Sequence, residues 1–262
     1  NTGIATYIWV LTNKKPDHRK GKVQLIDATQ WYTSLRKNLG QKNCELSETN
    51  IEQICKTFLE FKETEQSKIF ENKAFGYWKV VVERPLRLKV DLSERRRAAF
   101  RLACADADDE PIANLVDRVE SHPGAGPHVD FNTVRWTSEA DAEKHGVKLT
   151  AKRWRLIEDS LAERDEAAER VLKKVHKPGK AKADPLHGLF EASVEGKACV
   201  VEYEPDSEWR DTEQVPLLEE GGIEAFIRRE VLPYAPDAWV GKEATKIGYE
   251  ISFNRYFYKP QP

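Results

Sequence analysis

The sequence predicts an α/β protein in which strands come first, a mainly helical region follows, and a small α+β unit ends the chain. Residues 4–11 form a short, nearly continuous apolar run rich in β-branched and aromatic side chains, typical of a strand covered on both faces. Charged helical patterns dominate the middle of the chain, and alternating patterns return in its last third. The expected regions are residues 1–90, 91–183 and 184–262.

In the first region, residues 22–27 predict a second strand, close enough to pair with residues 4–11 as an antiparallel hairpin. Ser47 and the polar residues after it predict the start of a helix. Residues 75–88 return to strand character, with Pro85 ending the ladder or marking an edge. The predicted helix has an apolar stripe, made of Ile51, Ile54, Cys55, Phe58 and Leu59.

In the middle region, Ser93 can cap one helix and residues 111–119 can form another, while residues 122–132 are expected to be a loop. The longest helix is predicted over residues 150–175, where charged side chains recur at i,i+4 spacing. Residues 176–185, rich in Pro, Gly and Lys, interrupt it.

In the last region, a hairpin is expected around Glu195 and Gly196, and a short helix over residues 222–232. The last strand alternates apolar and polar residues as a half-buried strand does. Its expected core side chains are Ile247, Tyr249, Ile251 and Phe253.

Composition bounds the class of protein. The 262 residues carry a net charge of −2, so any contact with nucleic acid must come from a local basic surface. Neither a membrane-spanning run nor a signal peptide is recognisable, and we expect a cytoplasmic protein without membrane contact. The four cysteines have no metal-binding spacing and predict free, mostly buried thiols. The start at Asn1 and the absence of methionine fit a segment of a longer protein.

Three stretches resemble one family of proteins: NTGIATYIWVLTNKKPDHRKGKVQLIDA, GGIEAFIRREVLPYAPDAW and TKIGYEISFNRYFY. They resemble the carboxy-terminal portion of the modification (methylase) subunit of type I restriction-modification systems, which are N6-adenine DNA methyltransferases that use S-adenosylmethionine. The stretches KVHKPGKAKADPLHGLFEA and EYEPDSEWRDTEQVPLLEEGG are similar to longer members. The resemblance implies the terminal strands of a Rossmann-like methyltransferase sheet, DNA as substrate, and the specificity and restriction subunits as partners.

The same resemblance implies a role for the start of the chain. In the family, a stretch of this kind lies beside the pocket that receives the extruded adenine, and the matching residues here are Thr2, Gly3, Ile4 and Thr6. The alternative is that Ile4 and Thr6 are ordinary strand residues that pack against helices.

The family's catalytic motifs are not in this sequence. These motifs are a glycine-rich cofactor loop and an Asn/Asp-Pro-Pro-aromatic motif. HPGAGPH (residues 122–128) contains glycines, but it is not expected to follow a strand or to open a helix. We therefore expect no catalytic residue in this segment and no cofactor bound by it alone; S-adenosylmethionine would belong to the full-length parent.

Two basic clusters are candidates for binding DNA phosphates. One contains Arg95 and Arg96, with Arg97 and Arg101 nearby. The other cluster is the preferred candidate. It contains His176 and five lysines: Lys173, Lys174, Lys177, Lys180 and Lys182. The alternative is a solvated helix face and a charged linker.

No other site is expected. His122, His128 and Asp130 lie in a Pro/Gly-rich loop that would define a metal site poorly, and no serine stands in a nucleophile elbow. The sequence thus indicates a methylase segment that completes the fold and supports contacts with DNA and the specificity subunit. The alternative is a related, non-catalytic DNA-binding or interaction scaffold.

Overall fold

The computed structural model describes residues 6–40, 42–119 and 126–257 of a mixed α/β protein with several small sheets. The chain forms two compact units, each assembled from separate segments. Unit 1 comprises Asn1–Lys79, Gln214–Gly222 and Lys246–Pro262, and unit 2 comprises Val80–Glu213 and Ile223–Thr245. These interleaved units differ from the three consecutive regions expected from the sequence, whose boundaries stay a prediction.

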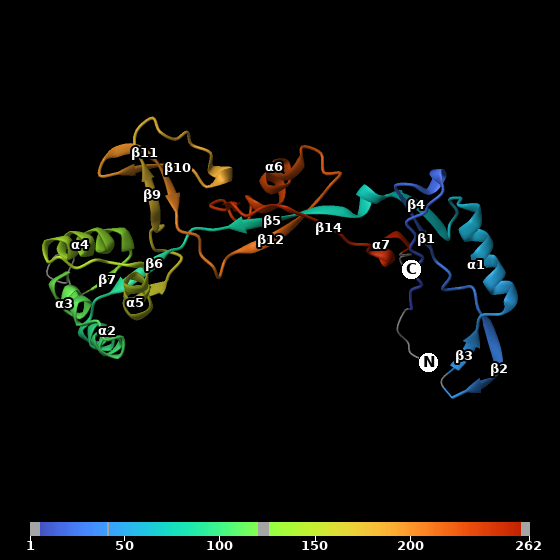
Figure 1. Cartoon of the computed structure of the whole chain (residues 1–262), viewed down its shortest axis with the longest axis horizontal. Helices are drawn as coiled ribbons and strands as arrows, with labels where there is room; N and C mark the ends of the chain where they lie inside the picture. The colour runs from blue at the N-terminus through green and yellow to red at the C-terminus, as the bar shows by residue number, and fades with distance from the viewer. Residues whose placement is uncertain (1–5, 41, 120–125, 258–262) are drawn as a thin grey trace. The chain divides into compact units, whose positions relative to one another are not determined.

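Unit 1 contains small antiparallel sheets and one long helix (Figure 1). Strand β1 (Lys22–Ile26) pairs with β4 (Ser67–Glu71), and β2 (Thr33–Leu39) pairs with β3 (Lys42–Glu45). The start of β5 (Gly76–Glu83) pairs with β14. The other elements are α1 (Glu48–Glu60), β14 (Lys246–Tyr249), α7 (Phe253–Phe257) and the 3-10 turns Asp17–Arg19 and Asn72–Phe75.

Helix α1 begins where the sequence predicts. The Ser47 hydroxyl accepts a hydrogen bond from the Asn50 amide, and the Asn50 side chain accepts one from the Ser47 amide, which is a reciprocal cap. The apolar stripe does not lie in a core, however. No residue of α1 is buried, and the Leu59 side chain is 72% exposed.

The strand predicted at residues 4–11 is wrong for the described part. Residues 6–11 adopt no regular secondary structure, and Ile8 and Leu11 are 83% and 82% exposed. The predicted hairpin partner, β1, pairs with β4 instead, because β4 offers a complete antiparallel register from Lys22↔Glu71 to Ile26↔Ser67. An apolar run specifies a buried strand only where neighbouring strands are available to cover it.

In unit 2, helices α2 to α5 accompany a short three-stranded sheet (Figure 1). The helices bury a single apolar cluster that includes Phe100, Ile112, Phe131 and Leu161, each at most 1% exposed. The elements are β6 (Leu88–Asp91), α2 (Glu94–Asp106), α3 (Glu110–Val119), β7 (Pro127–His128), α4 (Phe131–Lys144), α5 (Ala151–Leu161) and β8 (Ala162–Arg164).

The long helix expected over residues 150–175 ends at Leu161. Beyond it, β8 pairs with β6, and Asp165 forms a turn by accepting a hydrogen bond from the Ala167 amide. The i,i+4 charge pattern favoured a helix, but pairing with an existing strand prevailed, as tertiary context commonly overrides propensity.

Helix α4 was not predicted, and it replaces the end of the expected loop. Asp130 caps it by accepting hydrogen bonds from the Asn132 amide at 2.9 Å and the Thr133 hydroxyl at 2.8 Å. Its buried residues include Phe131, Val134 and Ser138, which follow helical spacing.

The rest of unit 2 carries a second three-stranded sheet, in the order β10-β11-β9. The expected hairpin is confirmed: Glu195 and Gly196 both have positive φ angles, 51° and 74°, as a tight two-residue turn requires. The elements are β9 (Leu172–His176), β10 (Phe190–Val194), β11 (Lys197–Tyr203), the π-helical turn Ile227–Val231 and β13 (Trp239–Val240). Two further elements, β12 (Asp211–Pro216) and α6 (Gly222–Phe226), each belong partly to unit 1, which includes Gln214–Gly222.

The carboxy-terminal strand is shorter and more exposed than expected. Strand β14 ends at Tyr249, and its Ile247 and Tyr249 side chains are about 60% exposed rather than in a core. Residues from Phe253 form α7 instead. Alternation identified the strand, whereas burial depends on a covering layer that the sequence does not specify.

The core of unit 2 can be tested with a matched pair of variants on α2. Phe100→Ala removes a ring that is 0% exposed and should lower the free energy of unfolding by about 3–5 kcal/mol. Leu102→Ala, at a position 69% exposed on the same helix, should change it by less than about 0.5 kcal/mol. Urea unfolding measures both values, and equal losses would contradict the assigned core.

Candidate nucleic-acid interface

The preferred basic cluster lies on a strand edge and the turn that follows it. We call Lys173, Lys174, Lys177, Lys180 and Lys182 the lysine segment; the first two lie in β9 and the others follow it. The turn is built on Pro178 and Gly179: the Lys180 amide donates to the Lys177 carbonyl, and Gly179 has φ 72°. All five lysines are exposed.

Glu202, the acid that lies across the sheet from the lysine segment, already has two other partners. Glu202 on β11 lies across from Lys174, but His176 Nε2 lies 2.9 Å from its Oε1 and Lys242 Nζ lies 2.6 Å from its Oε2. The hydrogen bond from Lys242 is the largest of the effects that lower the pKa of Glu202 below its ordinary value of 4.5. Both carboxylate oxygens are therefore occupied by groups other than Lys174.

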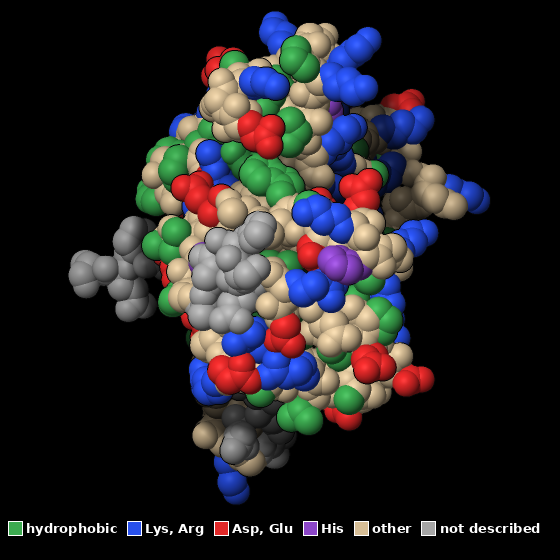
Figure 2. Space-filling model, turned by 90° about the vertical axis from the view of Figure 1, so that its left-hand side faces the viewer, with side chains coloured by type: hydrophobic (Ala, Val, Ile, Leu, Met, Phe, Trp, Pro, Cys, Tyr) green, Lys and Arg blue, Asp and Glu red, His purple; other side chains and the backbone are tan. Residues whose placement is uncertain are grey.

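Within the described part of the chain, no carboxylate forms an ion pair with any lysine of this segment. On the end of unit 2 that carries α3 and α4, by contrast, basic and acidic side chains are interspersed (Figure 2). Unpaired ammonium groups on an exposed edge can bind phosphates without first breaking an internal salt bridge.

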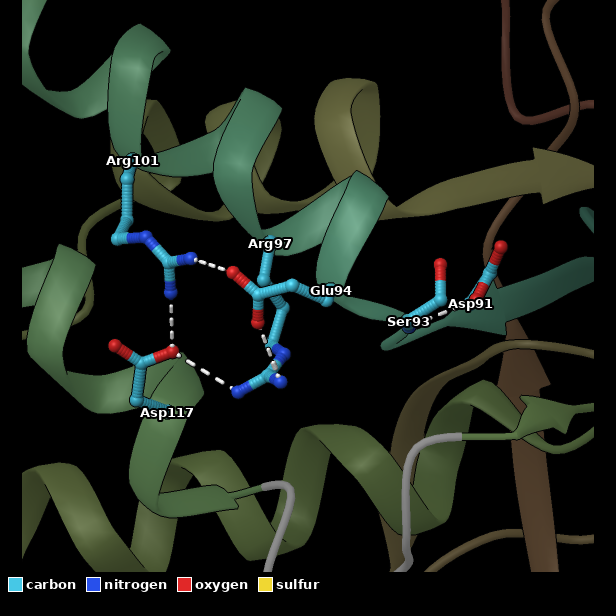
Figure 3. A network of polar contacts seen from close by, with 6 residues as sticks. All are labelled: Asp91, Ser93, Glu94, Arg97, Arg101 and Asp117. Atoms are coloured by element: carbon cyan, nitrogen blue, oxygen red, sulfur yellow. Dashed lines mark hydrogen bonds and ion pairs between the residues drawn. The ribbon is translucent and has the colours of Figure 1, made fainter.

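The arginine cluster differs in this respect, since its members face acids (Figure 3). Arg97 donates to Glu94 at 2.8 Å and to Asp117 at 3.2 Å. Arg101 donates to the other oxygen of Glu94 and, at 2.7 Å, to Asp117. The network joins α2 to α3, so these guanidinium groups stabilise the helix packing instead of presenting free charge.

Arg95 and Arg96, the weaker candidates for phosphate binding, also lie beside acids. Arg96 lies 3.0 Å from Glu163 and 4.0 Å from Asp91. Arg95 is exposed, and its charge contributes to the lowered pKa of Asp91, for which the backbone hydrogen bond from Ser93 is the largest cause. Apart from Arg95, the arginine cluster is engaged with acids, so the lysine segment is the larger group of cations available for an anionic partner.

The target-base stretch lies mostly outside the described residues, which include Thr6 but not Thr2, Gly3 or Ile4. Thr6 is exposed and belongs to no strand. The next residue, Tyr7, packs edge-on against Phe253 with ring centroids 5.4 Å apart. The pocket role of these residues therefore stays a prediction.

The described residues do not fit a cofactor loop. His122 lies outside them, and helix α4, which follows Gly126, has its N-terminus occupied by the Asp130 carboxylate, which would repel a phosphate or carboxylate ligand. Among the described residues, no group of three His, Cys, Asp or Glu side chains could hold a metal ion. No helix over the same residues is long and apolar enough to cross a membrane.

The cysteines are free, but only Cys104 is buried; Cys44 and Cys199 are partly exposed and Cys55 is exposed. Burial raises the pKa of the Cys104 thiol to about 11, which keeps it protonated and non-nucleophilic at neutral pH.

Sequence reasoning missed the acids that decide which cations are free. Glu94 could have been found, because it stands three residues before Arg97 on a predicted helix. Asp117 and Glu202 could not, since each reaches its partners only after separate elements pack together.

Comparison with known proteins relates the first part of the chain to a family. Residues 1–81 match the family model of N-6 DNA methylases, and the match supports a methyltransferase-related function for that part of the chain. It ends at residue 81, close to Lys79, where the first segment of unit 1 ends. No curated protein and no solved structure matched the chain.

The contacts of Glu202 predict a pH-dependent contribution to stability. Because its pKa is lowered in the folded state, its contribution is present above its unfolded pKa near 4.5 and is lost as pH falls through the folded value. Glu202→Gln should lower the free energy of unfolding by about 1.5 kcal/mol at pH 7 and by much less at about pH 3. Glu191→Gln, at an exposed position of β10, is the control; a loss for Glu202→Gln that is independent of pH would contradict the assignment.

Proposed function

We propose that this chain is the carboxy-terminal segment of the modification subunit of a type I restriction-modification system. The parent subunit transfers a methyl group from S-adenosylmethionine to N6 of adenine in DNA. The match of residues 1–81 to the N-6 DNA methylase model is the observation that carries this proposal. The resemblance of the later stretches to the longer type I subunits supports the finer identification.

The first role of the segment is to complete the methylase fold. Residues 8–11 are apolar on successive positions, more than 60% exposed, and pair with no strand among the described residues. Contiguous apolar side chains on a surface commonly mark a place that another part of a protein covers. We assign this run to a contact with the rest of the methylase domain in the parent, and it forms no strand within the segment itself.

The second role is contact with DNA through the lysine segment. Its five ammonium groups can bind successive phosphates, which supplies affinity without reading sequence. Sequence reading falls to the specificity subunit, and the restriction subunit completes the complex. Thr2, Gly3, Ile4 and Thr6 are assigned to the target-base pocket by resemblance alone.

S-adenosylmethionine belongs to the parent in this proposal, where it supplies the transferred methyl group. The residues of this segment do not fit its site, because the segment has neither the glycine-rich loop nor the Asn/Asp-Pro-Pro-aromatic motif. The segment is therefore not expected to bind the cofactor or to catalyse transfer alone.

A second candidate is a non-catalytic DNA-binding or interaction scaffold related to the methylase. The observation that favours it is the position of the lysine segment, which lies in unit 2 and outside the matched residues. Either function retains the DNA contact, so that contact is the property to test on this chain.

Two variants with equal changes in charge test the DNA contact. One replaces Lys177, Lys180 and Lys182 by Gln, and the other replaces Lys144, Lys148 and Lys152, which are exposed elsewhere in unit 2. Titration of a labelled DNA duplex should show weaker binding by the first variant only. The slope of log affinity against log salt concentration should become less negative by about 0.9 for each phosphate that the variant no longer neutralises. Equal weakening by both variants would show that only net charge matters.

A further inference from the structure

A pocket in unit 2 lies at one end of the lysine segment. It encloses about 310 Å³, a volume at the lower end of the range of roughly 300–1,000 Å³ typical of small-molecule sites. Trp239, Tyr203 and Pro205 supply apolar lining. The charged lining residues are Glu83, Glu202, Glu243, Lys173, Arg210 and Lys242. The pocket thus combines a small apolar area, since Trp239 and Tyr203 are each 6% exposed, with groups of both signs.

The position of Glu83 follows from strand pairing. It lies across from Trp239, where β13 pairs with the end of β5, so both side chains project from the same side of the sheet. The Glu83 side chain is only 7% exposed. The backbone pairing therefore fixes a carboxylate beside the indole in the wall of the pocket.

One oxygen of this carboxylate lacks a partner. Arg210 lies 2.8 Å from Oε1, whereas Oε2 is buried and accepts no hydrogen bond. A buried carboxylate oxygen without a donor is destabilising, so a ligand that brings an N–H group to it gains more than an exposed hydrogen bond would give. The Arg210 side chain is 43% exposed and also lies 3.2 Å from Glu243, so it keeps a carboxylate partner if a ligand displaces it from Glu83.

Lys173 connects the pocket to the proposed DNA-binding surface. It lines the pocket, belongs to the lysine segment, and has no carboxylate partner among the described residues. Glu202, Lys242 and Arg210 are paired internally. The pocket still offers a buried acceptor at Glu83 and, among the described side chains, a cation without a carboxylate partner at Lys173. A ligand that complements both carries an amino group and an anionic group, joined by a flat part that fits beside the exposed edge of Trp239.

The geometry points to a binding site for one nucleotide of an unpaired DNA strand, with an amino-bearing base beside Trp239 and its phosphate at Lys173. The base amino group donates to Glu83 Oε2 once Arg210 turns aside, and the strand continues along the lysine segment. Such combinations of a basic track and an aromatic wall are usual in proteins that bind single strands. This site rests on the proposed DNA contact, but its test can fail while that contact stands.

The test compares labelled homopolymers of about 12 nucleotides, a length that covers the usual single-strand sites. Adenine and cytosine present an exocyclic amino donor, whereas thymine presents a carbonyl acceptor. Fluorescence anisotropy on the full chain should show oligo(dA) and oligo(dC) binding roughly tenfold more tightly than oligo(dT). Glu83→Gln should remove this preference, while Glu191→Gln, at an exposed position of β10, should keep it.

Competition by free nucleotides provides a second measurement that does not depend on the folding of a variant. On the unaltered chain, dAMP should displace labelled oligo(dA) at a lower concentration than dTMP. Equal binding of the three homopolymers, a preference that survives Glu83→Gln, or equal competition would each overturn the site. If duplex binding still depends on Lys177, Lys180 and Lys182 in that case, the proposed function stands without it.

Discussion

Hydrogen bonding along strand β5 is the constraint on which both units depend. The first half of β5 pairs with β14 in unit 1, from Lys79↔Lys246 to Gly76↔Tyr249, and its last residues pair with β13 in unit 2. The chain therefore passes from unit 1 into unit 2 within β5, and β14, which pairs with the start of β5, follows unit 2 in the sequence. This arrangement explains why segments far apart in sequence belong to one unit, and why unit 2 is inserted between two paired strands.

Sequence signals correctly predicted the features that depend on a few adjacent residues. Ser47 and the turn at Glu195 and Gly196 predicted a helix start and a hairpin, because capping and positive φ angles are properties of a few adjacent residues. The same reasoning failed where burial depends on distant partners. Leu11 and Ile247 have strand-like patterns but are exposed, and the charge pattern beyond Leu161 belongs to strands that pair with β6 and β11.

The candidate site likewise depends partly on local sequence and partly on contacts between distant residues. The positions of the lysines and arginines are visible in the sequence, but their availability depends on acids brought together by folding. Glu94 and Asp117 neutralise Arg97 and Arg101 between two helices, whereas Glu202 engages His176 and Lys242 and leaves Lys174 unpaired. The arginine cluster thus stabilises helix packing, whereas the lysine segment can bind an anionic partner.

Residues 1–81 match N-6 DNA methylases, and the central proposal is that the catalytic motifs of such a methylase lie ahead of them in the parent. Methyl transfer by the complete subunit, expressed with its specificity subunit, tests this most directly. Duplex DNA incubated with labelled S-adenosylmethionine and digested to nucleosides should carry the label in N6-methyldeoxyadenosine. The reading frame ahead of Asn1 should encode the glycine-rich loop and the Asn/Asp-Pro-Pro-aromatic motif. A frame without these motifs, or DNA without label in adenine, would contradict the claim.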